Sequence, residues 1–257
     1  MPPGATMTAM IRGRPLIIDT HRDPNVCLHC QARPFSVCSV IDDADLQRLG
    51  AAAVTMTVQP GHSFIQEGGQ AEHFFNVTAG TAKLYKLLPD GRRQVTGFAG
   101  VGYFLGLAVS ASYAFSAEAL EPVQVCRFSR AKLRELLDDF PALEKKLLEV
   151  ASHELVVAQE QMLLLGRKTA RERLASFLIA RVKMLPHCMG QQTVATKERI
   201  DLPMTRMDIA DYLGLTIETV SRTLSRLRAE KLIEIPNNSE IVVLKHTALD
   251  NIATGMT

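Results

Sequence analysis

The stretch from Thr205 to Arg222, TRMDIADYLGLTIETVSR, predicts two helices joined by a three-residue turn. Thr205 and Thr216 carry the side-chain oxygens that cap helix N-termini, and Asp208 completes a capping box three residues after Thr205. Gly214 supplies the positive φ that such a turn requires. The stretch therefore predicts a helix-turn-helix.

The second of these helices has two chemically different faces. Its apolar positions are Ile217, Val220, Leu224 and Leu227, which hold a helix onto a core. The opposite face presents side chains that suit the DNA major groove. Arg222 can pair with a guanine, Glu218 can accept from a cytosine amino group, and Ser221 can adapt to either edge. We predict that these three residues read bases.

A strand-turn-strand pattern follows the second helix. Leu232–Ile235, the turn at Pro236–Ser239 and Ile241–Leu244 predict a hairpin, which is the wing of a winged helix-turn-helix. Side chains near this module would contact phosphates and position it on DNA. The predicted backbone contacts are Arg206, Thr216, Arg226, Arg228 and Lys231. A three-helix protein-binding module with a solvated charged face is the alternative.

The composition is that of a soluble protein with two modest domains. The 257 residues are 47% hydrophobic and 22% charged, which excludes a disordered or fibrous chain. No apolar run approaches the roughly 18 residues of a membrane span, and no signal peptide is visible, so we expect a cytoplasmic protein without a membrane partner. From Arg167 onward the chain has 14 basic and 10 acidic residues, net +4, against 15 and 17 before it, net −2. This excess suits a nucleic-acid-facing C-terminal module.

The N-terminal half predicts an antiparallel β-barrel or jelly roll. Short apolar runs separated by glycines extend from about Ala51 to Phe128. Within them the alternation at Ala82–Leu87, the turn residues Pro89–Gly91 and the run Val95–Phe98 predict a hairpin. Residues 1–24 contain four prolines and predict a flexible tail. We therefore expect an α+β protein with a tail (1–24), a sensor domain (25–140), a long helix (141–167) and a DNA-binding domain (168–257).

From Pro141 the apolar period becomes three or four residues, which predicts one helix of about 25 residues. A long helix with a near-heptad seam usually packs on a copy of itself or on a neighbouring domain. We predict homodimerisation through it, and a stripe that only covers the barrel is the alternative. Glu160 would either weaken the pairing by repulsion across the dimer axis or point to water. The predicted dimerisation residues are Leu147, Ala151, Leu155, Ala158, Glu160, Met162 and Leu165.

Cys27, Cys30 and Cys38 lie on one short segment without a helical period, with two and seven residues between them. In a reducing cytoplasm they are better candidates for metal ligands, reactive thiols or core residues than for disulfides. Three thiols on one loop can converge on an ion or a cluster. Cys126 is the remaining candidate for a fourth ligand in the sensor half, although a small buried apolar role suits it equally. We expect Cys188 to be a free thiol.

The order of these features resembles the CRP/FNR family of bacterial transcription regulators. The segment ETVSR at 218–222 after YLGL at 212–215 carries the resemblance, and Leu163–Phe177, with ARERLA at 170–175, is similar to the FNR branch. The resemblance covers nearly the whole chain after Asn25. It implies a homodimer on double-stranded DNA sites of the TTGAT-N4-ATCAA type. Promoter activation would also require RNA polymerase as a partner, for which the Lys86–Arg93 hairpin is a candidate contact, unless its charges are those of an ordinary loop.

The FNR resemblance further implies a [4Fe-4S] cluster on Cys27, Cys30, Cys38 and Cys126 that promotes dimerisation and DNA binding without oxygen. The best-known members have five residues between the second and third cysteines, where this chain has seven, and the longer loop bears on cluster lability. Zinc remains an alternative, because four thiolates beginning with C-x-x-C also form a structural zinc pattern. Further alternatives are sensing through haem, nitric oxide or thiol oxidation, and an iron-sulphur electron carrier, which leaves the base-reading helix without a purpose.

Neither cyclic nucleotide binding nor enzyme activity is expected. In nucleotide-binding relatives a Gly-Glu turn and an Arg-Ser/Thr-Ala segment hold the ribose and phosphate. The matching stretches here are Gly106-Leu107 and Phe115-Ser116-Ala117, with phenylalanine in place of the arginine. Burying a phosphate without that charged partner is costly. The chain also has no Gly-rich phosphate loop, nucleophile elbow or His-x-x-x-His pair.

Overall fold

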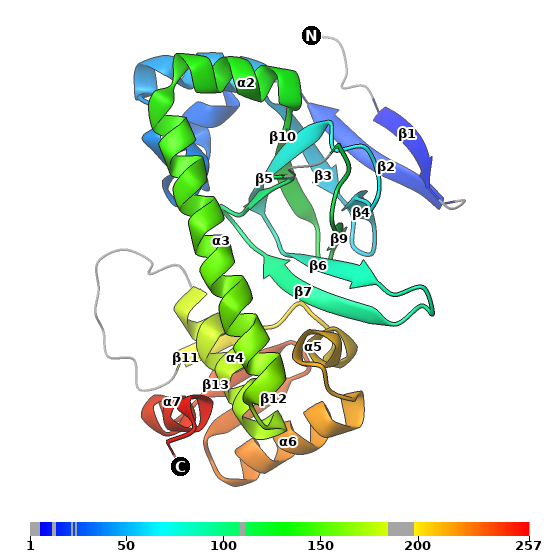
Figure 1. Ribbon diagram of the computed structural model, residues 1–257, viewed down its shortest axis with the longest axis vertical. Coiled ribbons are helices and arrows are strands. Elements are labelled where there is room, and N and C mark those ends of the chain that lie inside the picture. The colour runs from blue at the N-terminus through cyan, green and yellow to red at the C-terminus, as the bar shows by residue number, and fades with distance from the viewer. Residues whose placement is uncertain are drawn as a thin grey trace. The chain divides into compact units, whose positions relative to one another are not determined.

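The structure, a computed structural model, describes residues 6–11, 14–21, 23, 25–107, 111–184 and 198–256. The chain forms two compact units, Met1–Leu155 and Val156–Thr257. The boundary falls within the long helix α3 (Pro141–Arg167), which has the predicted bounds (Figure 1). Its first turns therefore belong to unit 1 and its last turns to unit 2, rather than to a separate segment.

Unit 1 contains two antiparallel sheets, as the predicted jelly roll requires (Figure 1). The first has the order β1-β2-β3-β10-β5-β8 and the second β4-β9-β6-β7. The strands are β1 (Thr6–Ile11), β2 (Arg14–His21), β3 (Val54–Val58), β4 (Ser63–Ile65), β5 (His73–Ala79), β6 (Ala82–Leu87), β7 (Arg93–Ala99), β8 (Phe104–Leu105), β9 (Ser116–Ala119) and β10 (Val123–Ser129). The β6–β7 pairing confirms the hairpin predicted from its turn residues.

Both faces of the central strands of the first sheet are buried, which creates two cores in unit 1. Phe75 and Val77 of β5 pack in the barrel core, whereas Phe74 lies in a second core on the opposite face. Helices α1 (Leu46–Ala52) and α2 (Arg130–Asp139) and the start of α3 contribute to this second core. Four short 3₁₀ helices precede α1, namely η1 (Val26–His29), η2 (Arg33–Phe35), η3 (Val37–Val40) and η4 (Asp43–Asp45).

The N-terminal residues differ from the predicted flexible tail where the structure describes them. Strands β1 and β2 form an antiparallel pair, and residues 19–21 of β2 pair with residues 55–57 of β3. β3 would otherwise leave one row of backbone donors and acceptors without strand partners. The composition of residues 1–24 does not show that β3 has a free edge. The prolines alone therefore predicted a flexible tail where the structure has two strands.

Unit 2 is the predicted winged helix-turn-helix with two additional elements. The elements are α4 (Ala170–Met184), β11 (Glu198–Asp201), α5 (Arg206–Leu213), α6 (Ile217–Ala229), β12 (Ile233–Asn237), β13 (Glu240–Val243) and α7 (His246–Thr254). β11 extends the β12–β13 wing into a three-stranded sheet, and α7 packs on α4. Neither β11 nor α7 was predicted. Cys188 lies outside the described residues. No helix in the described part of the chain is long and apolar enough to span a membrane.

Candidate nucleic-acid interface and metal centre

Helix α6 presents the three predicted base readers to solvent. Glu218, Ser221 and Arg222 are exposed. On the other side of α6, Val220, Leu224 and Leu227 are buried in unit 2 and Ile217 is half-buried. Hydrogen bonds from its own backbone N–H and from the Thr216 hydroxyl, together with the charge of Arg222, hold the pKa of Glu218 below its ordinary value. Glu218 is therefore an anion at neutral pH. The exposed face of α6 thus offers a hydrogen-bond acceptor and a guanidinium donor one helical turn apart.

Local hydrogen bonds fix where α5 and α6 begin. Thr205 Oγ1 accepts from the Asp208 backbone N–H at 3.1 Å, and the Asp208 carboxylate accepts from the Thr205 N–H at 3.0 Å. α5 ends at Gly214, whose φ is 61°, a conformation that favours glycine. Thr216 Oγ1 then accepts from the Thr219 N–H at 3.2 Å. The predicted capping residues and turn are confirmed.

Arg173 of α4 is a functional residue that sequence reasoning missed. Its Nε donates to the Lys168 carbonyl at 2.9 Å, its Nη2 to the Leu165 carbonyl at 2.8 Å, and its Nη1 to the Leu213 carbonyl at 2.8 Å. These carbonyls lie at the C-terminal ends of α3 and α5, where unpaired oxygens carry partial negative charge. One guanidinium therefore holds the helix-turn-helix against the end of α3. Its place in the ARERLA segment was the only sequence signal.

Replacing Arg173 with alanine is expected to destabilise unit 2 by about 2–4 kcal/mol, because three hydrogen bonds from a cation are lost. Operator affinity should fall by about tenfold or more, while the preferred base pairs stay the same, because Arg173 is not on the exposed face of α6. Thermal unfolding and titration with operator variants would measure both effects. Arg173→Lys keeps the charge but cannot reach all three carbonyls, so wild-type affinity in the lysine variant would contradict this positioning role.

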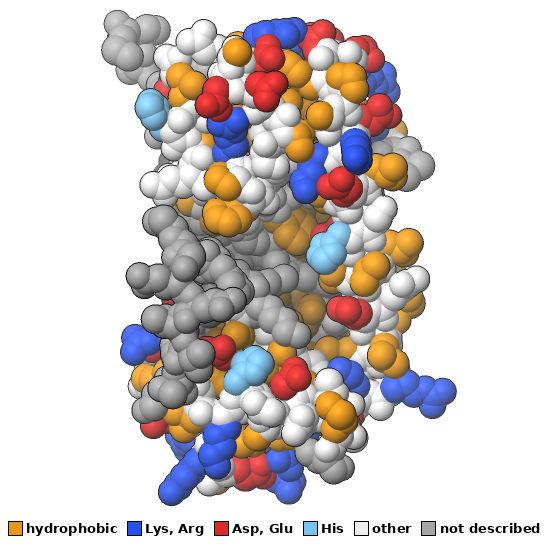
Figure 2. Space-filling view, turned by 90° about the vertical axis from the view of Figure 1, so that its left-hand side faces the viewer, with side chains coloured by type: hydrophobic (Ala, Val, Ile, Leu, Met, Phe, Trp, Pro, Cys, Tyr) orange, Lys and Arg blue, Asp and Glu red, His pale blue; other side chains and the backbone are white. Residues whose placement is uncertain are grey.

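The predicted phosphate-contacting residues differ in their exposure and in whether they already form ion pairs. Arg226 Nε lies 3.2 Å from Glu230 Oε1, and Glu230 also binds Arg171 Nη2 at 2.5 Å. Arg206 is half-buried, burial lowers its pKa, and its Nη1 is buried without a hydrogen-bond partner. Thr216, Arg228 and Lys231 are exposed, and Arg226 is exposed as well despite its ion pair. On unit 2, basic side chains gather at the lower end of the face drawn in Figure 2.

The four predicted metal ligands come together in unit 1. Cys27 lies on η1, Cys30 directly follows it, Cys38 lies on η3, and Cys126 lies on β10. Cys27 and Cys126 are buried in the second core of unit 1, and Cys38 packs against that core. All four are free thiols. The fold therefore joins a loop and a strand that are far apart in the sequence.

Burial favours the protonated form of three of these thiols. Burial is the largest cause that raises the pKa of Cys27 and Cys126 to about 12 and the pKa of Cys38 to about 11. The other three cysteines add to the shift at Cys126, so the four groups interact electrostatically. Holding them together as thiolates requires a compensating positive charge.

The described residues do not present a site for a single metal ion. No three or more His, Cys, Asp or Glu side chains among the described residues are placed to hold one metal ion. Zinc needs its four ligands on a single centre. In an iron-sulphur cluster the thiolates bind different irons and therefore stand further apart.

The cysteine segment is held in place by hydrogen bonds within itself and by a close contact with the barrel. Arg33 donates from Nη1 to Asp43 Oδ1 and from Nη2 to the Ile41 carbonyl, both at 2.6 Å. Gly102 has a φ of 88°, and a Cβ at this position would lie 2.5 Å from the Phe35 carbonyl oxygen. Only glycine permits this close approach. The expected loop without a helical period is therefore a series of 3₁₀ helices anchored at defined points.

The first turns of α3 share the core that contains the cysteines. Leu143 and Leu147 are buried in the same apolar cluster as Cys27 and Cys126. Within unit 1, the Tyr103 hydroxyl also donates to Glu154 Oε2 at 2.6 Å. Two of the cysteines and the start of α3 therefore belong to one packed core.

The exposed face of α3 differs from the predicted dimerisation set at two positions. Leu147 is buried in the second core, and Leu165 is half-buried beside the turn of the helix-turn-helix. Leu148, Leu155 and Met162, which are seven residues apart, are 68%, 61% and 65% exposed. The other predicted members, Ala151, Ala158 and Glu160, are exposed. The three-to-four-residue apolar period of α3 was predicted correctly. The period alone does not show which of two neighbouring apolar stripes on α3 is buried against the rest of the chain and which is exposed.

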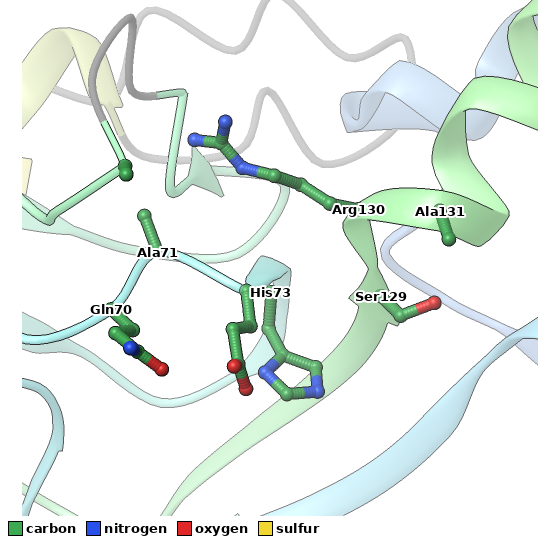
Figure 3. Close-up of a pocket in the computed structure, with 8 residues that line it drawn as sticks. Gln70, Ala71, His73, Ser129, Arg130 and Ala131 are labelled. Carbon is green, nitrogen blue, oxygen red and sulfur yellow. The ribbon is translucent and has the colours of Figure 1, made fainter.

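A shallow pocket of about 530 Å³ in unit 1 contains neither a cysteine nor a predicted base reader. Figure 3 shows the Arg130 side chain extending over it from the start of α2, with Gln70 and His73 across from Arg130. The Arg130 guanidinium lies 5.5 Å from the centre of the Phe74 ring, and burial lowers the pKa of His73. Because it is lined by none of the predicted site residues, the pocket is distinct from both candidate sites.

Two family models match this chain, the Crp-like helix-turn-helix domain over residues 172–252 and the cyclic nucleotide-binding domain over residues 55–140. The transcriptional activatory protein AadR of Rhodopseudomonas palustris is 41% identical over 207 residues, which cover 80% of this chain and 84% of AadR. The chain belongs to the CRP/FNR family of transcription regulators. The transcriptional activator protein FnrL of Cereibacter sphaeroides is 35% identical over 231 residues, 87% of this chain and 91% of FnrL. The structure of FixK2 from Bradyrhizobium japonicum matches with a TM-score of 0.71 and 36% identity, and covers 78% of this chain and 96% of FixK2.

Membership of the CRP/FNR family confirms the predicted fold class and a function in DNA-binding transcription regulation. The cyclic nucleotide-binding domain model matches the part of unit 1 from residue 55 to residue 140. In this regulator Phe115 packs against the barrel core, and the Ser116 hydroxyl accepts from the Glu67 backbone N–H at 3.0 Å. Residues 108–110, which lie between the two segments compared with the nucleotide-binding relatives, are outside the described residues.

Proposed function

We propose that this CRP/FNR-family protein is an oxygen-responsive homodimer that activates transcription from TTGAT-N4-ATCAA-like sites. Cys27, Cys30, Cys38 and Cys126 would hold a [4Fe-4S] cluster. The observation that carries the proposal is the core that Cys27, Cys126 and the flanking Cys38 share with the first turns of α3. When bound, the cluster supplies an oxygen-sensitive centre whose positive irons neutralise the four thiolates. The names of AadR and FnrL support activation as the outcome.

Side chains of α3 would couple the state of the cysteine core to the stability of the dimer. With the four sulfurs held together, Leu143 and Leu147 keep the first turns of α3 in one position against unit 1. This position favours self-association through the exposed stripe of Leu148, Leu155 and Met162. The coupling needs only a few kcal/mol, since it shifts an existing equilibrium.

Glu160 would keep the dimer marginal. It lies on α3 between Val156 and Leu163, which are 49% and 57% exposed at the flank of the stripe. In a symmetric dimer the two carboxylates would approach one another and repel. The empty form would then fall below the threshold of association. When the dimer does form, two copies of α6 about 34 Å apart fit successive turns of the major groove.

Phosphate and polymerase contacts complete the proposal. A DNA phosphate would supply the missing partner of Arg206 Nη1, and exposed Arg228 and Lys231 can add further contacts. At the tip of the β6–β7 hairpin, Leu87 and Leu88 are 47% and 48% exposed beside charged residues. This surface is our candidate for the RNA polymerase contact.

Samples prepared without air and samples exposed to air should differ in both association and DNA binding. We expect anaerobic protein to sediment as a dimer and to retard an operator fragment, and aerated protein to sediment mainly as a monomer with weak retardation. Iron and sulfide analysis of the same samples relates the difference to the cluster. Identical behaviour of the two samples would contradict the proposed mechanism.

Replacing Leu155 with glutamate is expected to raise the dimer dissociation constant by about a hundredfold or more. Each dimer would bury two unpaired carboxylates near its axis, at a cost of about 3 kcal/mol or more. Sedimentation velocity of anaerobic protein would measure the change. His153→Glu adds the same charge on the other side of α3 and should leave the dimer intact. Equal weakening by both variants would mean that charge alone, and not this stripe, sets association.

Cyclic AMP is expected not to bind, because Phe115 stands where the phosphate-binding arginine of nucleotide-binding relatives would be. Calorimetric titration of the full chain with cyclic AMP should give no heat beyond dilution. Micromolar affinity would refute this prediction.

A further inference from the structure

Asn76 on β5 is a buried polar residue whose side-chain amide oxygen, Oδ1, has no hydrogen-bond partner. It is 2% exposed, and its Oδ1 is enclosed by the described residues without a donor. The other buried polar side chains in the described part of the chain all have partners. Ser36 accepts from Cys38, Lys83 pairs with Glu118, Ser116 accepts from Glu67, and Asp208 caps α5.

The strand register places Asn76 beside a cysteine of the proposed metal centre. Asn76 pairs with Cys126 on β10 and, across the other edge of β5, with Phe104 on β8. Directly opposite residues of an antiparallel pair project to the same face of the sheet with their Cβ atoms about 5 Å apart. Phe75 and Val77, the neighbours of Asn76 along β5, face the barrel core instead. Asn76 therefore faces the cysteine core.

The core that Asn76 faces is apolar. Phe74 and Phe104 stack with their ring centres 5.8 Å apart in the same core. A cavity of about 10 Å³ lies beside Cys38 and Phe104 and is otherwise lined by apolar side chains. It has room for about one water at most and lacks the polar partners that a buried water needs. A leucine of similar size would avoid the cost of burying an unpaired amide.

We propose that the Asn76 carboxamide donates a hydrogen bond from Nδ2 to the sulfur of Cys126 when that sulfur is a metal-bound thiolate. The inference rests on the proposed function of the cysteine site. A thiolate only accepts hydrogen bonds, so the N–H₂ end of the amide must face it. Rotation of the amide about χ2 exchanges its two ends, which are nearly indistinguishable in shape. A donor at a ligand sulfur stabilises the more reduced cluster and raises its reduction potential. Asn76 thereby slows loss of the cluster in air.

The test compares wild type with Asn76→Leu, both as full-length protein purified without air. We expect the leucine variant to bind iron and sulfide as wild type does, to have a lower midpoint potential, and to lose its visible absorbance in air several-fold faster. Thermal unfolding supplies a second measurement that does not depend on DNA binding. The melting temperature of the iron-free protein should rise, because an unpaired buried amide is removed, whereas that of the cluster-loaded protein should rise less or fall.

Val77→Ala is the matched control, because it weakens the same strand on the face away from the cysteines. It should lower both melting temperatures equally and leave the midpoint potential unchanged. The role of Asn76 would be overturned if Asn76→Leu shifted the melting temperatures of the iron-free and the cluster-loaded protein equally, and left the midpoint potential and the rate of absorbance loss in air unchanged. The cluster proposal would remain intact in that case. Wild-type protein without iron and sulfide would overturn both.

Discussion

Replacing Cys126 with serine is expected to abolish iron binding by protein purified without air. Wild type should contain about four irons and four sulfides per chain, since the proposed site holds one [4Fe-4S] cluster. Serine is nearly isosteric but is a poor ligand for this soft-donor site, so one sulfur is lost with little change in volume. The same loss is expected for Cys27→Ser, Cys30→Ser and Cys38→Ser. Iron and sulfide analysis, together with the visible absorbance, would measure it.

Loss of iron should be accompanied by loss of the dimer, because Cys27, Cys38 and Cys126 share one core with the start of α3. The serine variants should sediment as monomers without oxygen and bind operator DNA as weakly as aerated wild type. Cys188→Ser is the control, and we expect it to keep its iron. One zinc per wild-type chain, or a colourless wild type that still dimerises and binds its operator, would contradict the cluster assignment.

Replacing Arg222 with alanine is expected to weaken operator binding by about thirtyfold or more. A bidentate contact between arginine and guanine contributes about 1–3 kcal/mol, and a two-fold site contains two such contacts. The variant should also lose discrimination at the guanine of each half-site, because the contact reads that base directly. Fluorescence anisotropy with the intact site and with a site changed at this position would measure both effects.

Arg199→Ala is a matched control for Arg222→Ala. Arg199 is a 71% exposed arginine of β11 in the same unit, and its Nε lies 2.8 Å from Glu240 Oε1. Its removal should change the affinity only slightly and preserve the preference for the intact site. If both variants lose the same affinity and both keep their base preference, Arg222 contributes only charge and does not read a base.

The helix-turn-helix could be predicted almost residue by residue because its determinants are local. Thr205 with Asp208, Gly214 and Thr216 act through hydrogen bonds and backbone angles within a few residues. The same is true of the β6–β7 hairpin, whose turn chemistry is contiguous in the chain. The exposed position of Arg222 on α6 follows from helical periodicity alone.

The errors arose where the answer depends on distant parts of the chain. Residues 1–24 contain strands because β3 offers an edge, and Leu147 is buried because the cysteine core covers that side of α3. Arg173 was missed because the carbonyls that it binds are near it only after α3, α4 and α5 have packed. Each case depends on burial or pairing between segments that are not neighbours in the sequence.

The cysteine site depends both on local sequence and on contacts between distant segments. Residue identity and spacing indicated three thiols on one loop and a candidate fourth, which is the chemistry of a soft-metal ligand set. Folding alone brings Cys126 to the other three, raises the pKa values of buried thiols, and places Asn76 in register beside Cys126. Short-range hydrogen bonding and periodicity are encoded in contiguous residues, whereas burial and electrostatic coupling arise only when distant strands and helices close around one another.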